Sequence, residues 1–444
     1  MSSQSTAQKL WNAARADPAS SYFNIPVAFR LEGPLDTDAV ERAFISLVRR
    51  HDTLRTVFEE TDGHVVKKVL PDVKLRLARH VVAPSSERER EVETILATEA
   101  DTPFDLAAGP LLRAGLVTLS ERDHVLFLTI HHAIFDQWSG AVLFHELSVL
   151  YEAHAYGGPC TLDPGPTQYA TCARQQAEWL SSADHERQLE YWKAQLRGPL
   201  PIIEMPGRRP TPDVSNVGAT HWFELPVGLG RQVAVAARTH RVTPFMLLLT
   251  TFMILLHRYT GEEDISVASA QARRRRREWE SVIGLLMNGV TFRALVRSHD
   301  TCDAVLKRVR DAALAAYDNQ DVPHGEVLRA VSAPASPEER TRQVSFHCAP
   351  RVRPQLSGVE TTFVPTATTC AKSRFGLSFH DEWRDGQVRW HGVVEYNAGL
   401  FLPADIARIV EDYEYVLAEV CNNPRATVAA LTAGIHGSST ERVE

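Results

Sequence analysis

The sequence predicts a mixed α/β protein built from two lobes. Strand-like and helix-like segments are interleaved in both halves of the 444-residue chain, as they are in layered α/β folds. A single hydrophobic core rarely grows beyond about 250–300 residues, so a chain of this length is expected to divide its apolar side chains between two cores. A stretch rich in proline and glycine between Gly158 and Gly218 marks the boundary. We place the division within it, giving residues 1–175 to the N-terminal lobe and residues 176–444 to the C-terminal lobe.

The expected first lobe is recognised by the spacing of its apolar residues. Alternation with a period of two predicts strands, and apolar positions three and four residues apart predict helices. The segment Val125–Ile130 is nearly all apolar, so we expect this strand to be buried on both faces. In chain order the elements are a strand at Ser21–Leu31, a helix capped by Asp36 or Asp38, a hairpin of Leu112–Leu119 and His124–Ile130, and a helix at Ser139.

The expected second lobe contains the longest apolar stretch of the chain, Phe245–Leu256. It is too short to span a bilayer, and we expect a buried core helix. Ser332–Arg342 is a polar loop. The other expected elements are helices at Ala183–Leu196, Gly230–His240, Pro244–Tyr259, Cys302–Tyr317 and from Pro403, with strands at His221–Leu225, Asp264–Ser269, Arg374–Trp383 and Gln387–Tyr396.

Composition and charge exclude several classes of function. With 48 basic and 55 acidic residues the net charge is −7, which argues against broad nucleic-acid binding. The N-terminal Met1–Ala16 segment is polar, without the apolar core of a secretory signal, and no membrane-spanning segment is expected. The six cysteines are scattered, with no CxxC pair, which favours reduced thiols, a cytoplasmic location and no zinc site.

The most informative segment is Ile130–Ser139, IHHAIFDQWS, at the junction of the buried strand and the following helix. Its two histidines and one aspartate allow three interpretations. They could belong to a metal site, but no HExxH pattern or further ligand cluster accompanies them. They could be hydrogen-bonded core residues, with Asp136 helping Ser139 to cap the helix. Alternatively a histidine could take a proton from an amine or hydroxyl nucleophile, while Asp136 holds the loop in shape.

Other catalytic motifs are absent from the sequence. There is no GxSxG elbow of a serine hydrolase, no GxxxxGK[ST] loop for a nucleotide phosphate, and no GxGxxG dinucleotide fingerprint. The chemistry that remains is acyl transfer from a donor that is already activated.

The HHxxxD pattern of His131, His132 and Asp136, followed by Trp138-Ser139, resembles the core motif of the condensation domains of nonribosomal peptide synthetases. Further segments resemble other motifs of that family in the same order, and together they cover essentially the whole chain. They are Ser5–Trp11 (SxAQxRLW), Arg50–Phe58 (RHExLRTxF), Tyr191–Leu196 (YWxxxL), His257–Asp264 (LHRYTGQDD), Ile283–Arg293 (IGxFVNTxxLR), Gln320–Pro323 (QDVP), Gln343–Phe346 (FQVMF) and Glu395–Phe401 (EYxxxLF).

The resemblance implies a fold and a set of site residues. The fold would be a V-shaped pseudo-dimer of two chloramphenicol-acetyltransferase-like lobes with a central tunnel. The motif would supply His132 as the catalytic histidine, acting as general base or positioning the nucleophile, with His131 beside it. Asp136 would be structural and paired with an arginine, for which Arg293 is the first choice and Arg50 the second. Asn288 and Ser139 would support the site.

The same resemblance implies the substrates and partners. An acyl or aminoacyl group would arrive on the phosphopantetheine arm of a carrier protein and pass to an amine or alcohol, giving an amide or ester in natural-product biosynthesis. The acceptor would be a free small molecule or bound to a second carrier. We expect a free-standing, monomeric enzyme without an intrinsic cofactor, because no carrier or adenylation segment is found. The alternatives are a CoA-dependent or polyketide-associated acyltransferase of the same superfamily and a non-catalytic module that recruits carrier proteins.

Several residues depart from the family's motifs or lie beside them. Gln137 replaces a glycine, Leu286-Met287-Asn288-Gly289 replaces Phe-Val-Asn-Thr, and His324-Gly325 changes the QDVPFE segment. The candidates for lining the tunnel are Gln137, Trp138, Gly289 and His347. The run of Arg273, Arg274, Arg275, Arg276 and Arg277 is either a solvated loop or a docking surface for an acidic carrier protein.

Overall fold

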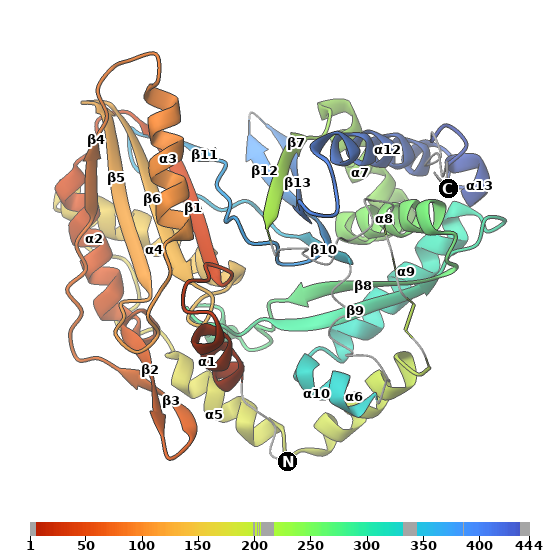
Figure 1. Cartoon of the computed structure of the whole chain (residues 1–444), viewed down its shortest axis with the longest axis horizontal. Helices are drawn as coiled ribbons and strands as arrows, with labels where there is room; N and C mark the ends of the chain where they lie inside the picture. The colour runs from red at the N-terminus through yellow and green to blue at the C-terminus, as the bar shows by residue number, and fades with distance from the viewer. Residues whose placement is uncertain are drawn as a thin grey trace. The chain divides into compact units, whose positions relative to one another are not determined.

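The chain folds into two compact α/β units. The computed structural model describes residues 6–198, 200–201, 203, 205, 217–331, 344–384 and 386–435. The first unit consists of Met1–Trp179, Ala272–Met287 and Val352–Cys370, and the second of Leu180–Gln271, Asn288–Arg351 and Ala371–Glu444. Each unit has its own sheet and helices (Figure 1), which confirms the predicted fold class. Two segments from the second half of the sequence are therefore part of the first unit.

The first unit is built on a five-stranded sheet with the order β11-β1-β6-β5-β4. The central strand β6 pairs with β1 on one side and β5 on the other, and its residues from His124 to His131 are buried. This confirms the strand expected to be buried on both faces. The elements are α1 Thr6–Ala16, β1 Asn24–Glu32, α2 Thr37–Arg50, η1 Asp52–Arg55, β2 Thr56–Thr61, β3 His64–Val69, β4 Ala78–Val81, α3 Arg88–Asp101, β5 Leu112–Ser120, β6 Asp123–His131, α4 Gln137–Tyr156, α5 Tyr169–Trp179, η2 Arg277–Trp279 and β11 Glu360–Val364.

Helices cover both faces of this sheet (Figure 1). Helices α2 and α4 pack against each other over one face, where Phe29 of β1 lies edge-on to Phe144 of α4. Helix α3 contributes Val92 and Leu96 to a smaller cluster on the other face. The main core also includes Ile134 and Phe135, which follow β6 directly, so the loop at the end of this strand is anchored by buried apolar side chains.

The second unit has a six-stranded sheet with the order β7-β13-β12-β10-β8-β9. Helix α8 is its core helix, and all its residues from Met246 to His257 are buried, as expected for the longest apolar stretch. The elements are α6 Ala183–Gln195, β7 Gly218–Glu224, α7 Val227–His240, α8 Pro244–Thr260, β8 Asp264–Gln271, β9 Asn288–Leu295, α9 Cys302–Asp318, α10 His324–Ala330, β10 Val344–Cys348, β12 Phe375–Arg384, β13 Gln387–Asn397, α12 Pro403–Asn422 and α13 Val428–Leu431.

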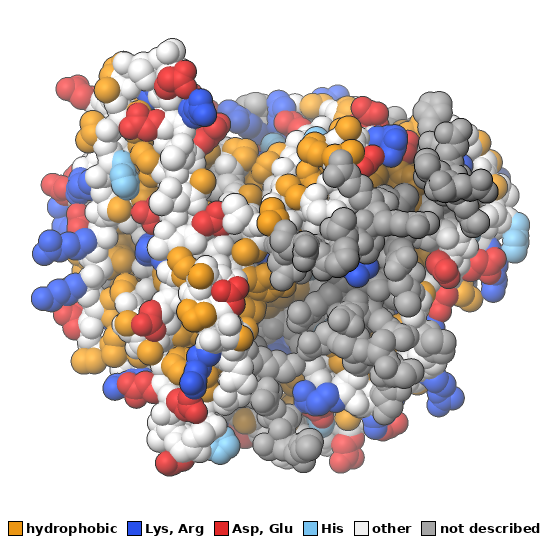
Figure 2. Space-filling model, viewed as in Figure 1, with side chains coloured by type: hydrophobic (Ala, Val, Ile, Leu, Met, Phe, Trp, Pro, Cys, Tyr) orange, Lys and Arg blue, Asp and Glu red, His pale blue; other side chains and the backbone are white. Residues whose placement is uncertain are grey.

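Among the described residues, no single helix is long and apolar enough to cross a membrane, and only α7 and α8 taken together, with a bend of 103° between them, pass that test. Acidic and basic side chains are interspersed over the described part of the surface that Figure 2 shows, as the modest net charge suggests. The expected polar loop at Ser332–Arg342 and the motif positions Ser5 and Gln343 lie outside the described residues.

Candidate active site

The HHxxxD segment forms a tight loop between β6 and α4 in the first unit. Strand β6 ends at His131 and α4 begins at Gln137. The His132 N–H donates to the carbonyl of Phe23 at 2.8 Å, and the Ile134 N–H donates to the carbonyl of His131 at 3.1 Å. With the buried side chains of Ile134 and Phe135 these bonds fix the loop at its strand end.

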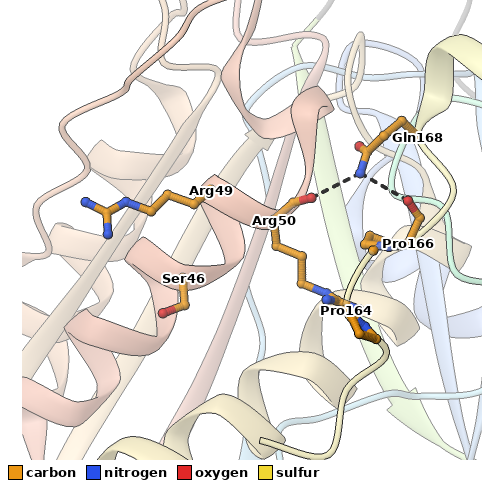
Figure 3. A pocket seen from close by; sticks show the side chains of 7 residues that line it. Ser46, Arg49, Arg50, Pro164, Pro166 and Gln168 are labelled. Carbon is orange, nitrogen blue, oxygen red and sulfur yellow. Dashed lines mark hydrogen bonds between the residues drawn. The ribbon is translucent and has the colours of Figure 1, made fainter.

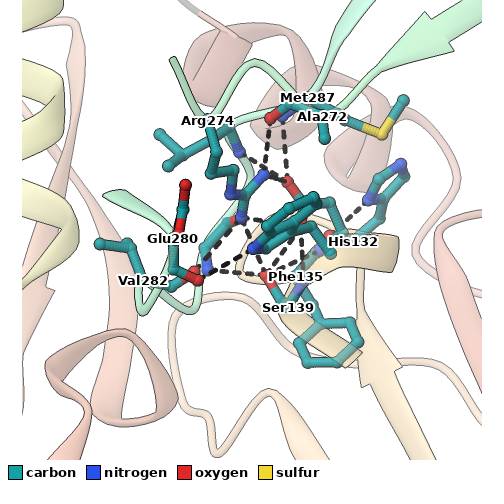
Figure 4. Close-up of polar contacts among 12 residues, drawn as sticks. His132, Phe135, Ser139, Ala272, Arg274, Glu280, Val282 and Met287 are labelled. Carbon is teal, nitrogen blue, oxygen red and sulfur yellow. Dashed lines mark hydrogen bonds and ion pairs between the residues drawn. The ribbon is translucent and has the colours of Figure 1, made fainter. Parts of the chain in front are cut away.

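His132 is held by its own loop. Its Nδ1 lies 2.6 Å from the carbonyl oxygen of Phe135 (Figure 4). A carbonyl can only accept, so Nδ1 carries the proton and, in the neutral ring, Nε2 carries the lone pair. The side chain is half-buried, while both neighbours in the chain are buried. The loop thus presents a histidine in the tautomer that a proton acceptor at Nε2 requires.

His131 occupies a different environment. It is 5% exposed, and its ring packs near Phe23 and Phe104. The Ala133 N–H donates to its Nδ1 at 3.1 Å. Burial, with a smaller effect of His132, lowers the pKa of His131 to about 4. These contacts support a positioning role for His131, as a neutral ring that fixes the loop.

The acid sensitivity of the fold tests this environment. Between pH 6.5 and pH 4 the unfolded chain binds a proton at His131 that the folded chain does not, so stability falls as the pH is lowered through this window and is unaffected above it. The loss attributable to His131 is about 3 kcal/mol, at about 1.4 kcal/mol for each pKa unit. In His131→Asn the amide oxygen can still accept from Ala133, so urea unfolding at pH 7, 6 and 5 should show a flatter pH dependence than wild type. Parallel curves for the two proteins would contradict a neutral buried His131.

Asp136 is the centre of the polar network behind the loop. It caps α4 in a reciprocal capping box with Ser139. One carboxylate oxygen accepts from the Ser139 N–H at 2.9 Å, the Ser139 hydroxyl at 2.7 Å and an Arg274 N–H at 2.9 Å. The other accepts from Arg274 and from the backbone N–H groups of Leu286 and Met287, both at 3.0 Å. Both oxygens of this buried carboxylate are fully engaged by these donors, which supports the structural role that the resemblance implies for Asp136.

The arginine that pairs with Asp136 is Arg274, and the two choices made from the sequence are wrong. Arg293 lies in strand β9 of the second unit and forms an ion pair with Asp264 at 2.6 Å. Asp264 is on the neighbouring strand β8, two residues from the position opposite Arg293. Arg50 binds Glu146 at 2.9 Å. Arg274 lies in the Ala272–Met287 segment, after a backbone turn at Arg273 with a left-handed φ of 51°. Its guanidinium also donates to the carbonyls of Ala272 and Gly284 and so ties that segment to the loop (Figure 4).

The arginine run divides into buried and exposed parts. The side chain of Arg274 is 1% exposed, and Arg273 is buried as well. Neither is available for docking, which corrects that part of the docking prediction. Arg275, Arg276 and Arg277 are exposed. The sequence alone carries no signal that separates the second arginine of five from its neighbours.

Ser139, Gln137 and Trp138 occupy the first turn of α4. The Ser139 hydroxyl is fully buried and accepts from the Gly284 N–H at 3.0 Å, which supports its predicted role. Gln137 is exposed and Trp138 is 40% exposed. The indole N–H of Trp138 donates to the carbonyl of Glu280 at 2.9 Å, a second tie between α4 and the Ala272–Met287 segment.

Arg50 belongs to another buried cluster in the first unit. Burial raises the pKa of Glu146, but His51 at 2.7 Å and Arg50 at 2.9 Å outweigh burial and lower it. Arg50 also lines a surface pocket of about 530 Å³, with Gln168 donating to the Arg50 carbonyl (Figure 3). The other lining residues are Ser46, Arg49, Pro164, Gly165, Pro166 and Gln168, and none belongs to the HHxxxD motif.

The remaining candidates lie in the second unit. The Asn288 amide donates to the carbonyls of Gln320 and Val322 at 2.8 and 2.6 Å and accepts from the His324 N–H, so Asn288 holds the QDVP segment against β9. A β-carbon at Gly289 would lie 3.0 Å from the His324 ring, which brings two of the departures from the family's motifs into contact. His347 lies half-buried in β10. The described residues contain no group of three or more histidine, cysteine and acidic side chains suited to a metal ion.

Comparison with known proteins identifies the class. Residues 2–434 match the condensation-domain family, to which the chain therefore belongs, a family of acyltransferases from nonribosomal peptide synthetases. The chain is 36% identical over 96% of its length to one of the linear gramicidin synthase proteins of Brevibacillus parabrevis, and 32% identical over 95% to the phosphinothricin tripeptide synthetase PhsC of Streptomyces viridochromogenes. It spans only 6% and 39% of those two proteins.

Solved structures share the fold. The X-domain from teicoplanin biosynthesis superposes with a TM-score of 0.81 at 24% identity, covering 96% of each chain. The first condensation domain of the calcium-dependent antibiotic synthetase gives a TM-score of 0.83 at 19% identity, covering 96% of this chain and 97% of that one. These similarities establish the condensation-domain fold that the motifs predicted.

Proposed function

We propose that the chain transfers an acyl or aminoacyl group from the phosphopantetheine thioester of a carrier protein to an amine or alcohol, forming an amide or ester. The observation that carries this proposal is the complete His132 loop. Its Nδ1–H is fixed on Phe135, and the loop behind it is closed by the Asp136–Arg274 pair. Membership of the condensation-domain family supports the reaction class.

The reaction balances without further reagents. The nucleophile attacks the thioester carbonyl carbon, a C–N or C–O bond forms, the C–S bond breaks, and the carrier's thiol leaves. The proton lost by the nucleophile passes to His132 Nε2 and then to the departing sulfur, or His132 orients the nucleophile while proximity supplies the rate. Since the thioester is already activated, we propose that no cofactor bound to the chain is needed.

We propose a carrier protein as the donor's partner, with Arg275, Arg276 and Arg277 as docking residues for its acidic surface. Exposed guanidinium groups are suited to carboxylate and phosphate oxygens. A cytoplasmic location, suggested by the cysteine pattern, belongs to the same proposal.

Recruitment of a partner without catalysis is a second candidate function. The fold similarity to the X-domain of teicoplanin biosynthesis, for which a complex with OxyB has been solved, favours it; this match has a TM-score of 0.80 at 25% identity. The occupied Asp136 network and the ordered His132 favour catalysis.

One experiment tests the proposal. A carrier protein loaded with an acyl or aminoacyl group is supplied as a separate polypeptide, amine and alcohol acceptors are offered, and products are followed by mass spectrometry. Amide or ester formation from the carrier thioester is expected, and formation with a separate carrier would show that the chain acts in trans. Transfer from CoA thioesters alone would favour the related acyltransferases, and carrier binding without transfer in any pairing would favour recruitment.

A further inference from the structure

The carbonyl end of α3 is capped by side chains from the sheet of the first unit. Helix α3 ends at Asp101, and the last carbonyl groups of a helix have no partner within it. The Asn24 amide of β1 donates to the carbonyls of Ala100 and Thr102 at 2.7 and 2.9 Å. Asn24 is opposite His131 in the ladder of β1 and β6. The end of α3 is therefore tied to the strand position at which the HHxxxD loop begins.

Arg113 of β5 caps the same helix end with several donors. Its terminal nitrogens donate to the carbonyls of Glu99, Thr102 and Pro103 at 2.9, 2.6 and 3.3 Å. Its Nε lies 3.4 Å from the Glu99 carboxylate, which balances the charge. The guanidinium carbon lies 3.9 Å from the centre of the Phe104 ring, within the range of a cation–π contact. Arg113 thus holds both the end of α3 and the aromatic ring that follows it.

Phe104 in turn packs against the first histidine of the motif. The centres of the Phe104 and His131 rings are 5.9 Å apart, with the planes at 80°, and Phe23 lies 5.8 Å from the same imidazole. His131 is buried while both phenylalanines are half-buried, so these rings are the part of the contact that reaches the surface. Burial, more than His132, lowers the His131 pKa to about 4. The neutral ring accepts from the Ala133 N–H at Nδ1, which a protonated ring cannot do.

We propose that Phe104 and Arg113 are positioning residues of the acyl-transfer site: Arg113 holds the Phe104 ring in place, and this ring keeps water from His131. His131 then remains an acceptor for the Ala133 N–H, and the loop keeps the shape in which it presents His132. Both residues act through His131, so neither is itself a catalytic residue. This inference rests on the proposed acyl transfer and deepens it, because it names the side chains that set the acid limit of the reaction.

An NMR titration of the His131 ring tests the shielding directly. The chain is labelled with isotope-enriched histidine, and the His131 signal is the one missing from His131→Asn. Phe104→Ala admits water, so the His131 pKa should rise by about two units, whereas the apolar side chain of Phe104→Leu should keep it low. Arg113→Met loses the donors that hold the end of α3 and should raise this pKa by about one unit. Arg122→Met, at an exposed position between β5 and β6, is the control and should leave it unchanged.

The pH profile of single-turnover transfer should follow the same titration. A rise of about two units leaves about one tenth of the Phe104→Ala molecules with a neutral His131 at pH 5. Its rate relative to wild type should therefore be close to one at pH 8 and about tenfold lower at pH 5. Phe104→Leu should restore the wild-type profile. A general loosening of the fold would instead lower the rate by the same factor at both pH values.

The outcomes separate this inference from the proposed function. A His131 pKa as low in Phe104→Ala as in wild type would overturn the shielding, whatever the rate of transfer. A raised pKa with the same relative rate at pH 8 and pH 5 would break the link between His131 and the reaction. If the His131 pKa depends on Phe104 but the wild-type chain transfers no acyl group from any loaded carrier, the shielding stands and the proposed reaction is wrong. An unchanged pKa in Arg113→Met would remove Arg113 from the network.

Discussion

Replacing Arg274 with alanine is expected to abolish acyl transfer and to lower the free energy of unfolding by about 3–5 kcal/mol, the cost of leaving a buried carboxylate without its cationic partner. The side chains of Arg274 and Asp136 are each 1% exposed, so water cannot replace the lost contacts. Urea unfolding followed by tryptophan fluorescence measures the stability, and product formation from a loaded carrier measures the transfer.

The same arginine run supplies a matched control. Arg276 is two residues further along and its side chain is 54% exposed, so Arg276→Ala should change stability by no more than about 0.5 kcal/mol. Asp136→Asn combined with Arg274→Gln removes both charges, and it should recover part of the stability lost in Arg274→Ala without restoring transfer. Equal stability of the Arg274→Ala and Arg276→Ala variants would contradict the network described for Asp136.

The loss of transfer follows from how the network reaches His132. Asp136 is the residue after Phe135, and the Phe135 carbonyl orients the His132 ring. Arg274, Leu286 and Met287 together hold the carboxylate that fixes this end of the loop. When Arg274 is removed, the buried Asp136 charge is stabilised by moving toward water, which pulls the Phe135 carbonyl away from Nδ1. Stability and catalysis therefore depend on the same contacts.

Local sequence patterns predicted the part of the site that is continuous in the chain. The apolar Val125–Ile130 run predicted a buried strand, and β6 is buried throughout that range. The position of Asp136 before Ser139 predicted a capped helix, and Asp136 caps α4 in a capping box with Ser139, the third residue of the helix. These features depend on neighbouring residues alone, so periodicity and capping rules suffice to find them.

The pairing of Asp136 could not be predicted in the same way. The choice of Arg293 was based on the family's motif, but the strand register brings Arg293 close to Asp264. Arg274 reaches Asp136 across 138 positions of sequence, after the left-handed turn at Arg273. In a run of five arginines no residue type marks the one that turns inward. The weakly amphipathic α3 and the exposed strand β3 also lacked a periodic signal, because few of their side chains are buried.

Replacing His132 with alanine is expected to lower the rate of acyl transfer by a factor of about 10²–10⁴, the range attributed to a positioned proton-transfer group. The free energy of unfolding should fall by only about 1 kcal/mol, because the variant loses one hydrogen bond, from Nδ1 to the Phe135 carbonyl. His64→Ala, at an exposed position of β3, is the control for removing an imidazole and should leave both transfer and stability unchanged. Single-turnover transfer from a loaded carrier and urea unfolding provide the two measurements.

Two further variants separate the possible duties of His132. Asparagine can donate to the Phe135 carbonyl as Nδ1 does, but it has no group at the position of Nε2, so His132→Asn should keep the loop and lose transfer. Glutamine can reach the position of Nε2 with an amide that orients a nucleophile without taking its proton. If His132 is a general base, His132→Gln will be as slow as His132→Asn, because the amide cannot accept the proton. If positioning dominates, His132→Gln will retain much of the rate, since holding the nucleophile near the thioester supplies most of the acceleration. Wild-type transfer in His132→Ala would contradict both duties and place the chemistry on another group.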